Sequence, residues 1–477
     1  MKGRLIFLAL DAADVDLIQT WAGNVGFEAF RRIVVGRKLI RVDNEPGLYV
    51  GSVWPTISTG STVASHGRYC WRQLRLGRYE DEFFQAEQIK GEPIWETLEK
   101  SGKSVCVIDI PKSIPGIKFK GRFVKDWGTH DPSTGGFRIY GWMKTAEFLM
   151  RYGKDEVGRC DAIERTMAGF AQFRDRLVAR AKARARMVCD VLSEGKEDVV
   201  MVSFSEPHCV GHQCWHLHDP QHELHDRMLR SNLGDPVLDV YKALNDAVES
   251  ILENIGELDT VIVLATHGMG LPYNAVELLN SIVADLEFGS LDAHDQDELR
   301  SLGIPHLLSS ESADFRRRLR VFPVPNNGAY AAFRLNIKGR EPDGRIAPEN
   351  ADQFLHEFHD KIMTTTNADT GEKLFVSAIF RPSYSSLPSD DLPDLLLEWN
   401  RSSPIRRVVT PRSILSNSNG GNPRTGDHRA RGGMWVIGPG ASSVESFDSL
   451  KSSEIARCMM QISGNACDAM VSPASGL

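Results

Sequence analysis

Short apolar runs alternate with amphipathic stretches along the first half of the chain. The runs are rich in Val, Ile and Leu and have the length of buried strands; they lie at 4–10, 105–110, 198–204 and 260–265. Stretches with apolar residues at helical spacing lie between them, and they predict helices at 14–21, 93–102, 162–193 and 237–255. Apolar strands that alternate with helices indicate a mainly parallel sheet covered on both faces. The pattern therefore predicts an α/β fold.

The second half of the chain is less regular. Residues 288–325 are polar and charged, and we expect an insertion or cap there. A second insertion, near the site, is expected at 112–160. Strands are predicted at 328–335, 373–380 and 394–399, and a helix at 350–366. We therefore assign 1–287 and 326–477 to one catalytic core.

Composition excludes some classes of partner. The 477 residues are 42% apolar and 25% charged, with a net charge of −7, which argues against binding a nucleic-acid duplex. No apolar stretch approaches the roughly 20 residues that span a bilayer, so no membrane partner is expected. The first apolar run is interrupted by Asp11 and is marginal as a secretion signal. The chain is expected to be cytoplasmic, and its oligomeric state stays open.

The cysteines and a basic stretch favour structural interpretations. The eight cysteines contain no Cys-x-x-Cys pair and are expected to be reduced and mostly buried. Cys209 and Cys214 flank a histidine pair and are considered as soft ligands, but their helical spacing differs from that of the histidines. The arginine-rich stretch 174–186 is interpreted as an amphipathic helix with a solvated face rather than as a nucleic-acid surface.

Residues typical of metal sites lie beside the apolar runs. Asp11 follows the first run, His267 follows the run 260–265, and His428 precedes an apolar run at 434–437. His208 and His212 follow the run 198–204, and their i, i+4 spacing places two imidazoles on one helical face. Ligands of α/β folds bind at the carboxyl edge of the sheet. The five residues therefore predict one metal site at that edge.

Short motifs spread over most of the chain form a specific combination, although each alone is weak. They lie at 8–14, 54–67, 204–215, 265–268, 333–344, 392–399 and 426–432. In this combination the chain resembles the type I phosphodiesterase and nucleotide pyrophosphatase branch of the alkaline phosphatase superfamily. The resemblance implies an alkaline-phosphatase-like α/β fold, with two divalent ions and a Ser or Thr nucleophile.

Only some of the site residues that the resemblance implies have counterparts in this chain. Asp11 and His267 correspond to ligands of the ion beside the nucleophile, and His212 and His428 to ligands of the other ion. Three positions depart from the family pattern: His208 and Thr266 each replace an aspartate, and Val50 occupies the position of the nucleophile.

The departures predict unequal metal sites. His208, His212 and His428 would supply the three imidazoles of a catalytic zinc site with one open position. The other site would keep Asp11 and His267, with Thr266 as a weak neutral donor. Glu206 could restore a carboxylate there, or orient a histidine instead. We expect one tight ion, with the second weak or absent, and Zn²⁺ in preference to Mn²⁺ or Fe.

The nucleophile and the phosphate-binding residues are open to more than one assignment. Ser52 is the nearest hydroxyl before a helix expected at 54–59, and Thr56 within that helix is the alternative. A hydroxyl is a poor nucleophile at neutral pH unless a cation lowers its pKa, and metal-bound hydroxide is the other candidate attacker. Arg429 and Arg431 are candidate contacts for phosphate oxygens.

The expected function is hydrolysis of a small phosphorylated substrate. The resemblance favours a phosphodiester or a nucleotide-like pyrophosphate. Two alternatives stay open. One is a non-catalytic or partly degenerate family member that binds a phosphorylated ligand or partner without turnover; Val50 and Thr266 are substitutions expected in such a protein. A phosphotransferase or phosphomutase on the same scaffold is the other. The ligands retained at positions 11, 212, 267 and 428 favour an enzyme.

Overall fold

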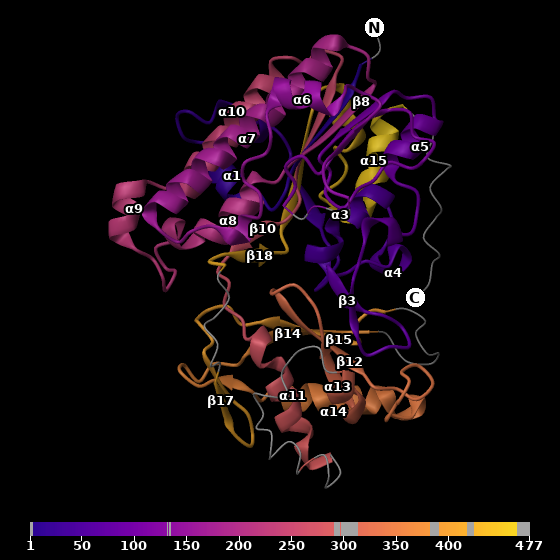
Figure 1. Cartoon of the computed structure of the whole chain (residues 1–477), viewed down its shortest axis with the longest axis vertical. Helices are drawn as coiled ribbons and strands as arrows, with labels where there is room; N and C mark the ends of the chain where they lie inside the picture. Colours follow the sequence, from indigo (N-terminus) through magenta and orange to yellow (C-terminus); the bar gives the residue numbers. More distant parts are fainter. Residues whose placement is uncertain are drawn as a thin grey trace.

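The chain folds into two lobes, each with its own sheet (Figure 1). The computed structural model describes residues 3–130, 132, 135–290, 296, 313–381, 391–416 and 424–464. The larger lobe holds the central sheet, and the smaller lobe lies beyond β10 (Gly268–Gly270) and β18 (Asp427–Arg429). Among the described residues, no helix combines the length and apolarity needed to cross a lipid bilayer.

The central sheet has nine strands in the order β20-β2-β19-β9-β1-β8-β5-β6-β7. At its centre, β1 (Leu5–Leu10) is parallel to both β8 (Val199–Phe204) and β9 (Thr260–Ala265). β5 (Val105–Ile108) and β6 (Arg122–Lys125) continue the parallel part. The remaining strands are β2 (Ile40–Asp43), β7 (Arg138–Tyr140), β19 (Gly432–Ile437) and β20 (Ser449–Lys451). The predicted α/β class with a mainly parallel sheet is confirmed.

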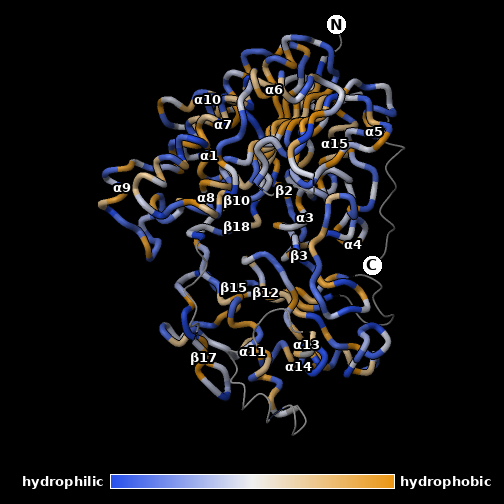
Figure 2. The backbone as a smooth tube through the Cα atoms, viewed as in Figure 1, coloured by the Kyte–Doolittle hydropathy of each residue, from blue (hydrophilic) through white to orange (hydrophobic). Residues whose placement is uncertain are grey.

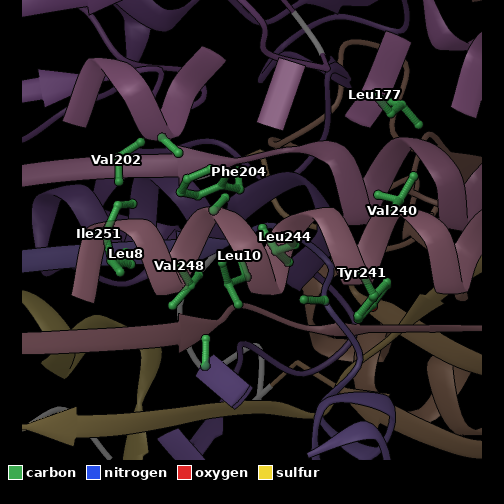
Figure 3. Close-up of a cluster of buried hydrophobic side chains, with 14 of the residues drawn as sticks. Leu8, Leu10, Leu177, Val202, Phe204, Val240, Tyr241, Leu244, Val248 and Ile251 are labelled. Carbon is green, nitrogen blue, oxygen red and sulfur yellow. The ribbon is translucent and has the colours of Figure 1, made fainter. Parts of the chain in front are cut away.

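Both faces of this sheet are covered by helices whose apolar sides meet it. One face carries α1 (Val15–Trp21), α2 (Glu28–Val34), α7 (Met167–Glu194) and α10 (Pro236–Leu252). The other carries α3 (Tyr49–Thr59), α5 (Ile94–Lys100) and α15 (Ile455–Ile462). Figure 3 shows Leu8, Leu10, Val202 and Phe204 of the strands beside Leu244 and Val248 of α10. Apolar positions cluster along the central strands, as Figure 2 shows.

The arginine-rich part of α7 departs from the expected solvated face. Lys182 and Arg186 are exposed, but Arg180 and Arg184 are 3% and 0% exposed. Buried guanidinium groups need charged partners. Glu206 Oε1 accepts from Arg180 Nε at 2.9 Å, and Asp109 Oδ2 accepts from Arg184 Nη2 at 2.9 Å. The partners lie far away in sequence, which is why the local pattern could not show them.

The smaller lobe has an antiparallel sheet and its own apolar core. Its sheet order is β11-β12-β15-β14, and the strands are β11 (Val321–Val324), β12 (Tyr330–Leu335), β14 (Phe375–Phe380) and β15 (Leu395–Trp399). The helices are α11 (Leu279–Glu287), α13 (Ala313–Arg318) and α14 (Ala351–Ile362). A further small sheet consists of β13 (Thr366–Asn367), β16 (Arg407–Val409) and β17 (Ile414–Ser416).

The extent of this lobe differs from the expected cap at 288–325. Its core draws on residues from 48 to 79 and from 275 to 415, so the expected boundary at 326 falls inside it. Apolar packing across distant segments, which local composition does not reveal, accounts for the difference. The segments 291–295 and 297–312 of the expected cap lie outside the described residues. The expected insertion at 112–160 contains β6 and β7, which belong to the central sheet, and α6 (Thr145–Tyr152).

Short elements complete the fold. They are α4 (Val63–His66), α8 (Glu206–His218), α9 (Arg227–Leu233), β3 (Arg72–Leu74) and β4 (Asp81–Phe83). Of these, α8 bears most on the site, because it starts directly after β8 at the carboxyl edge of the sheet.

Candidate metal centre

The register of the central strands brings the expected ligands to one edge. Leu10 of β1 is level with Phe204 of β8 and Ala265 of β9, so the three strands end together. Asp11, the start of α8 and His267 follow these ends directly. The antiparallel pairing of β10 with β18 places His428 opposite Met269. Segments far apart in the sequence therefore meet at the carboxyl edge.

Four of the expected histidines form a buried cluster. The ring centroids of His208, His212 and His428 are separated by 4.6 Å (208–212), 4.9 Å (208–428) and 4.6 Å (212–428). The centroid of His267 lies 4.6 Å from that of His428. His212 Nε2 and His428 Nε2 are 3.1 Å apart, and His428 Nδ1 is 2.9 Å from His267 Nε2. The predicted convergence of imidazoles is present.

The protonation of this cluster suits a metal ion. Burial is the first cause that holds the pKa of His208, His212 and His428 well below the ordinary value, and it lowers that of His267 to about 3. The rings are therefore neutral, which is the form that binds cations.

Two ring nitrogens have the environment of ligand atoms. The carbonyl of Gly426 lies 2.7 Å from His212 Nδ1, so that nitrogen carries the proton and Nε2 keeps a lone pair toward His428. His208 Nδ1 is buried and has no hydrogen-bond partner among the described residues. A divalent cation between the imidazoles would satisfy both nitrogens, and the residues present fit Zn²⁺ chemistry.

Two further residues, His130 and Asp427, have ligand atoms close to those of the predicted histidine ligands. Ligand atoms within 4.8 Å of one another form one group of His130, His208 and His212, and another of His212, Asp427 and His428. His212 is common to both groups. Burial raises the pKa of Asp427, and its Oδ1 accepts from the His428 amide at 2.8 Å. Sequence analysis did not identify His130, because it lies several residues beyond β6, a strand of only four residues.

At the expected second ion site, the side chains proposed as ligands form hydrogen bonds with other groups of the protein. Asp11 Oδ1 accepts from Trp54 Nε1 at 3.1 Å and from Thr266 Oγ1 at 3.4 Å. Thr266 Oγ1 also accepts from the Ala12 amide and lies 3.0 Å from His267 Nδ1. Burial raises the pKa of Asp11 to about 7, and the charge of His130 opposes that rise. Neither Asp11 nor His267 joins a ligand-atom group among the described residues.

The candidate nucleophiles form hydrogen bonds away from the cavity. Ser52 is fully buried in α3, and its hydroxyl donates to the Leu48 carbonyl at 2.8 Å. Thr56 Oγ1 lies 3.0 Å from His66 Nε2. Val50 and Gly51 line the cavity, whereas Ser52 and Thr56 are not among its lining residues. A role for Ser52 as nucleophile stays a prediction, and it would require its side chain to rotate.

Basic side chains surround the histidines in a cavity of about 420 Å³. Arg68, Lys112 and Arg424 line it, together with Trp54 and Trp71. Arg424 forms a bidentate ion pair with Asp161, at 2.9 and 2.7 Å, and its Nη1 lies 3.4 Å from His212 Nε2. Fixed positive charge of this kind stabilises phosphoryl oxygens.

The arginines predicted to contact phosphate lie elsewhere. Arg431 pairs with Asp16, and Arg429 lines a separate cavity of about 330 Å³ with Tyr49 and Arg401. Successive side chains of a strand point to opposite faces, so His428 in β18 faces the histidine cluster while its neighbour Arg429 does not. Arg424, which lines the cavity with the histidines, was not identified from the sequence, because an arginine outside helices and strands has no distinguishing pattern.

Glu206 does not contact the histidines in the way expected. It is fully buried, and its Oε1 accepts from Arg180 Nε at 2.9 Å and from Arg184 Nη1 at 2.5 Å. Its carboxylate therefore neutralises two guanidinium groups of α7. The other oxygen, Oε2, is buried and has no hydrogen-bond partner among the described residues, so a role for Glu206 as the replacement ligand of the second ion stays a prediction.

Comparison with known proteins identifies what the chain is similar to. The family model described as type I phosphodiesterase / nucleotide pyrophosphatase matches residues 5–431. No curated protein matches the chain significantly. Phosphonoacetate hydrolase from Sinorhizobium meliloti 1021, solved with phosphonoacetate, superposes with a TM-score of 0.51 at 13% identity, over 97% of this chain and 96% of that one. Murine ectonucleotide pyrophosphatase / phosphodiesterase 5 gives 0.49 at 11% identity, over 97% and 96%.

Proposed function

Because the chain belongs to the type I phosphodiesterase and nucleotide pyrophosphatase family, within the alkaline phosphatase superfamily, and is a hydrolase, we propose that it cleaves a phosphodiester or a nucleotide-like pyrophosphate in a metal-dependent reaction. One observation carries the proposal. Three neutral, buried imidazoles converge beside a cavity that basic side chains line. Imidazoles supply the metal ligands, and the basic groups supply charge for phosphoryl oxygens.

His208, His212 and His428 would hold the principal ion, with Zn²⁺ favoured by the all-imidazole ligand set. A bound divalent cation would polarise a phosphoryl oxygen and lower the pKa of a water molecule to about 7. The Gly426 carbonyl fixes the tautomer of His212 and so directs its free lone pair into the centre. On the other side, Thr266 engages both Asp11 and His267, so a second ion there would bind more weakly.

The cavity lining supports a substrate that carries an anionic phosphoryl group beside a flat group. Arg424 and Lys112 would contact the phosphoryl oxygens, and the pair with Asp161 orients Arg424 before substrate binds. Arg68 would add positive charge, since its Nε and Nη1 donate to backbone carbonyls. Trp71 lines the same cavity and packs against Phe83, with 5.3 Å between the ring centroids; because Trp71 is 51% exposed, the rest of its ring surface is available for stacking with a base. This arrangement favours a nucleotide-like substrate.

The attacking group is expected to be water rather than Ser52. In Ser52→Ala we expect kcat to stay within about twofold of the natural protein, because the lost hydroxyl donates only to the Leu48 carbonyl. Loss of a true nucleophile would lower kcat by on the order of 10⁴-fold or more. Steady-state kinetics at saturating Zn²⁺ measures the difference. Ser58→Ala is the matched control, since Ser58 is also buried in α3 and donates to the Pro55 carbonyl. A collapse of kcat in Ser52→Ala alone would reinstate Ser52.

A substrate panel tests the function itself. We expect bis-p-nitrophenyl phosphate to be hydrolysed faster than p-nitrophenyl phosphate or p-nitrophenyl sulfate. Removal of metal by a chelator should lower the rate at least about 100-fold, because the ion supplies several kcal/mol of transition-state stabilisation. Zn²⁺ or Mn²⁺ should restore it. Metal-loaded protein that binds nucleotides but turns over none of the three esters would favour the non-catalytic alternative instead.

A further inference from the structure

Two thiols and an imidazole form a second cluster beside the histidine centre. The ligand atoms of His130, Cys160 and Cys209 all lie within 4.8 Å of one another. His130 Nδ1 is 2.9 Å from Cys160 Sγ and 3.8 Å from Cys209 Sγ. Cys160 and Cys209 are 2% and 1% exposed, and His130 is partly exposed. None of the three belongs to the residues that the family pattern assigned.

Three separate parts of the chain supply this cluster. His130 lies beyond β6, Cys160 opens a short 3₁₀ turn at Cys160–Ala162, and Cys209 lies in α8 directly after His208. The ring centroid of His130 is 4.0 Å from that of His208 and 5.8 Å from that of His212. The thiol cluster therefore borders the histidine cluster, and His130, whose ligand atoms also group with those of His208 and His212, lies between the two.

The donor set has the chemistry of a soft-metal site. Thiolate and imidazole ligands bind Zn²⁺ and related cations, with Zn–S near 2.3 Å and Zn–N near 2.0 Å, so ligand atoms of a tetrahedral site are separated by roughly 3.5–3.8 Å. The separation of 3.8 Å between His130 Nδ1 and Cys209 Sγ already fits. The separation of 2.9 Å between His130 Nδ1 and Cys160 Sγ would lengthen through a shift of the Cys160 side chain.

A neighbouring guanidinium group contacts one of the two thiols. Arg180 Nη2 lies 3.3 Å from Cys209 Sγ, within the buried network around Glu206. In contrast, the Asp11 side of the cavity presents a carboxylate and an imidazole that are already hydrogen-bonded within the protein. The thiol cluster offers three donors within 4.8 Å of one another, whereas Asp11 and His267 join no such group among the described residues.

We propose that His130, Cys160 and Cys209 bind a thiophilic divalent cation, Zn²⁺ or Cd²⁺, at a position adjacent to that of the ion held by His208, His212 and His428. The ion would tie the turn at Cys160–Ala162 and the segment of His130 to α8. It would thereby fix the start of the helix that carries His208 and His212. This proposal concerns ion binding only, and it does not depend on hydrolysis of any particular ester.

Zinc K-edge X-ray absorption of the natural protein, loaded with Zn²⁺ and kept reduced, tests the site directly. We expect a sulfur shell near 2.3 Å in addition to nitrogen scatterers. Substitution with Co²⁺ should give thiolate-to-cobalt charge-transfer absorption. Spectra that contain only nitrogen and oxygen scatterers would overturn the proposal. A thiol count that falls by two without metal, which indicates a Cys160–Cys209 disulfide under the same reducing conditions, would also overturn it.

Variants assign the sulfur shell to these residues. Cys160→Ser with Cys209→Ser should lose one equivalent of Zn²⁺ and the sulfur shell, while the nitrogen-bound ion stays. Cys189→Ser is the matched control, since this partly exposed thiol of α7 contacts the Ser250 carbonyl, and its zinc content should not change. Retention of sulfur scattering in the double variant would refute the assignment. If the double variant fails to fold, the spectra of the natural protein still decide whether zinc is bound by thiolate.

Discussion

His212→Ala is expected to lower kcat/KM by at least about 10³-fold and to remove the principal ion. Loss of a group that only orients a ligand already costs 10- to 100-fold, and His212 is a ligand candidate common to both ligand-atom groups around the histidines. Its Nε2 lies 3.1 Å from His428 Nε2, and its protonated Nδ1 donates to the Gly426 carbonyl. Replacement by alanine therefore removes a donor and the orientation of that donor. Zinc content by mass spectrometry, together with kcat/KM on a diester, measures both effects.

His218→Ala provides the control for this variant. His218 lies near the end of the same helix, is partly exposed and pairs with Asp235 at 2.8 Å. It is not among the residues that line the cavity, so metal content and kcat/KM should stay near those of the natural protein. If His212→Ala kept both its zinc and its rate, the three-imidazole centre would be wrong.

The sequence was most informative where local pattern and sheet register act together. Runs of Val, Ile and Leu predicted β1, β8 and β9, and the level ends of these strands explain why Asp11, His208 and His267 meet. The helical spacing of His208 and His212 predicted that both lie on one side of α8. Such features depend on neighbours in sequence and on the general geometry of parallel sheets.

Contacts between distant segments could not be predicted in this way. His130 and Arg424 come from segments without a regular apolar pattern, yet both line the cavity. Arg429 looked equally suitable in sequence, but it lies on the other face of β18. The helix α3 extends from Tyr49 to Thr59 and not only over the expected 54–59. Its course decides where the Ser52 hydroxyl points, and an aligned position alone cannot show that direction.

Glu206→Gln is expected to destabilise the larger lobe by about 3–5 kcal/mol, because breaking a buried ion pair leaves a charge without compensation. Glu206 accepts hydrogen bonds from Arg180 and Arg184, and the side chains of all three are at most 1% exposed. Asp109 still pairs with Arg184 at 2.9 Å, which favours the lower end of this range. Scanning calorimetry should show a lower Tm for the transition of this lobe.

Glu249→Gln is the matched control, because its ion pair with Arg32 is partly solvated and should contribute no more than about 1 kcal/mol. Metal content separates two roles of Glu206 below the unfolding temperature. If Glu206 only neutralises the arginines of α7, its replacement by glutamine leaves the zinc of the histidine centre in place. If Glu206 is a ligand of that ion, the same replacement removes the zinc. Loss of zinc from the folded Glu206→Gln protein, with little change in Tm, would therefore show that Glu206 is a metal ligand and not a structural partner of the arginines.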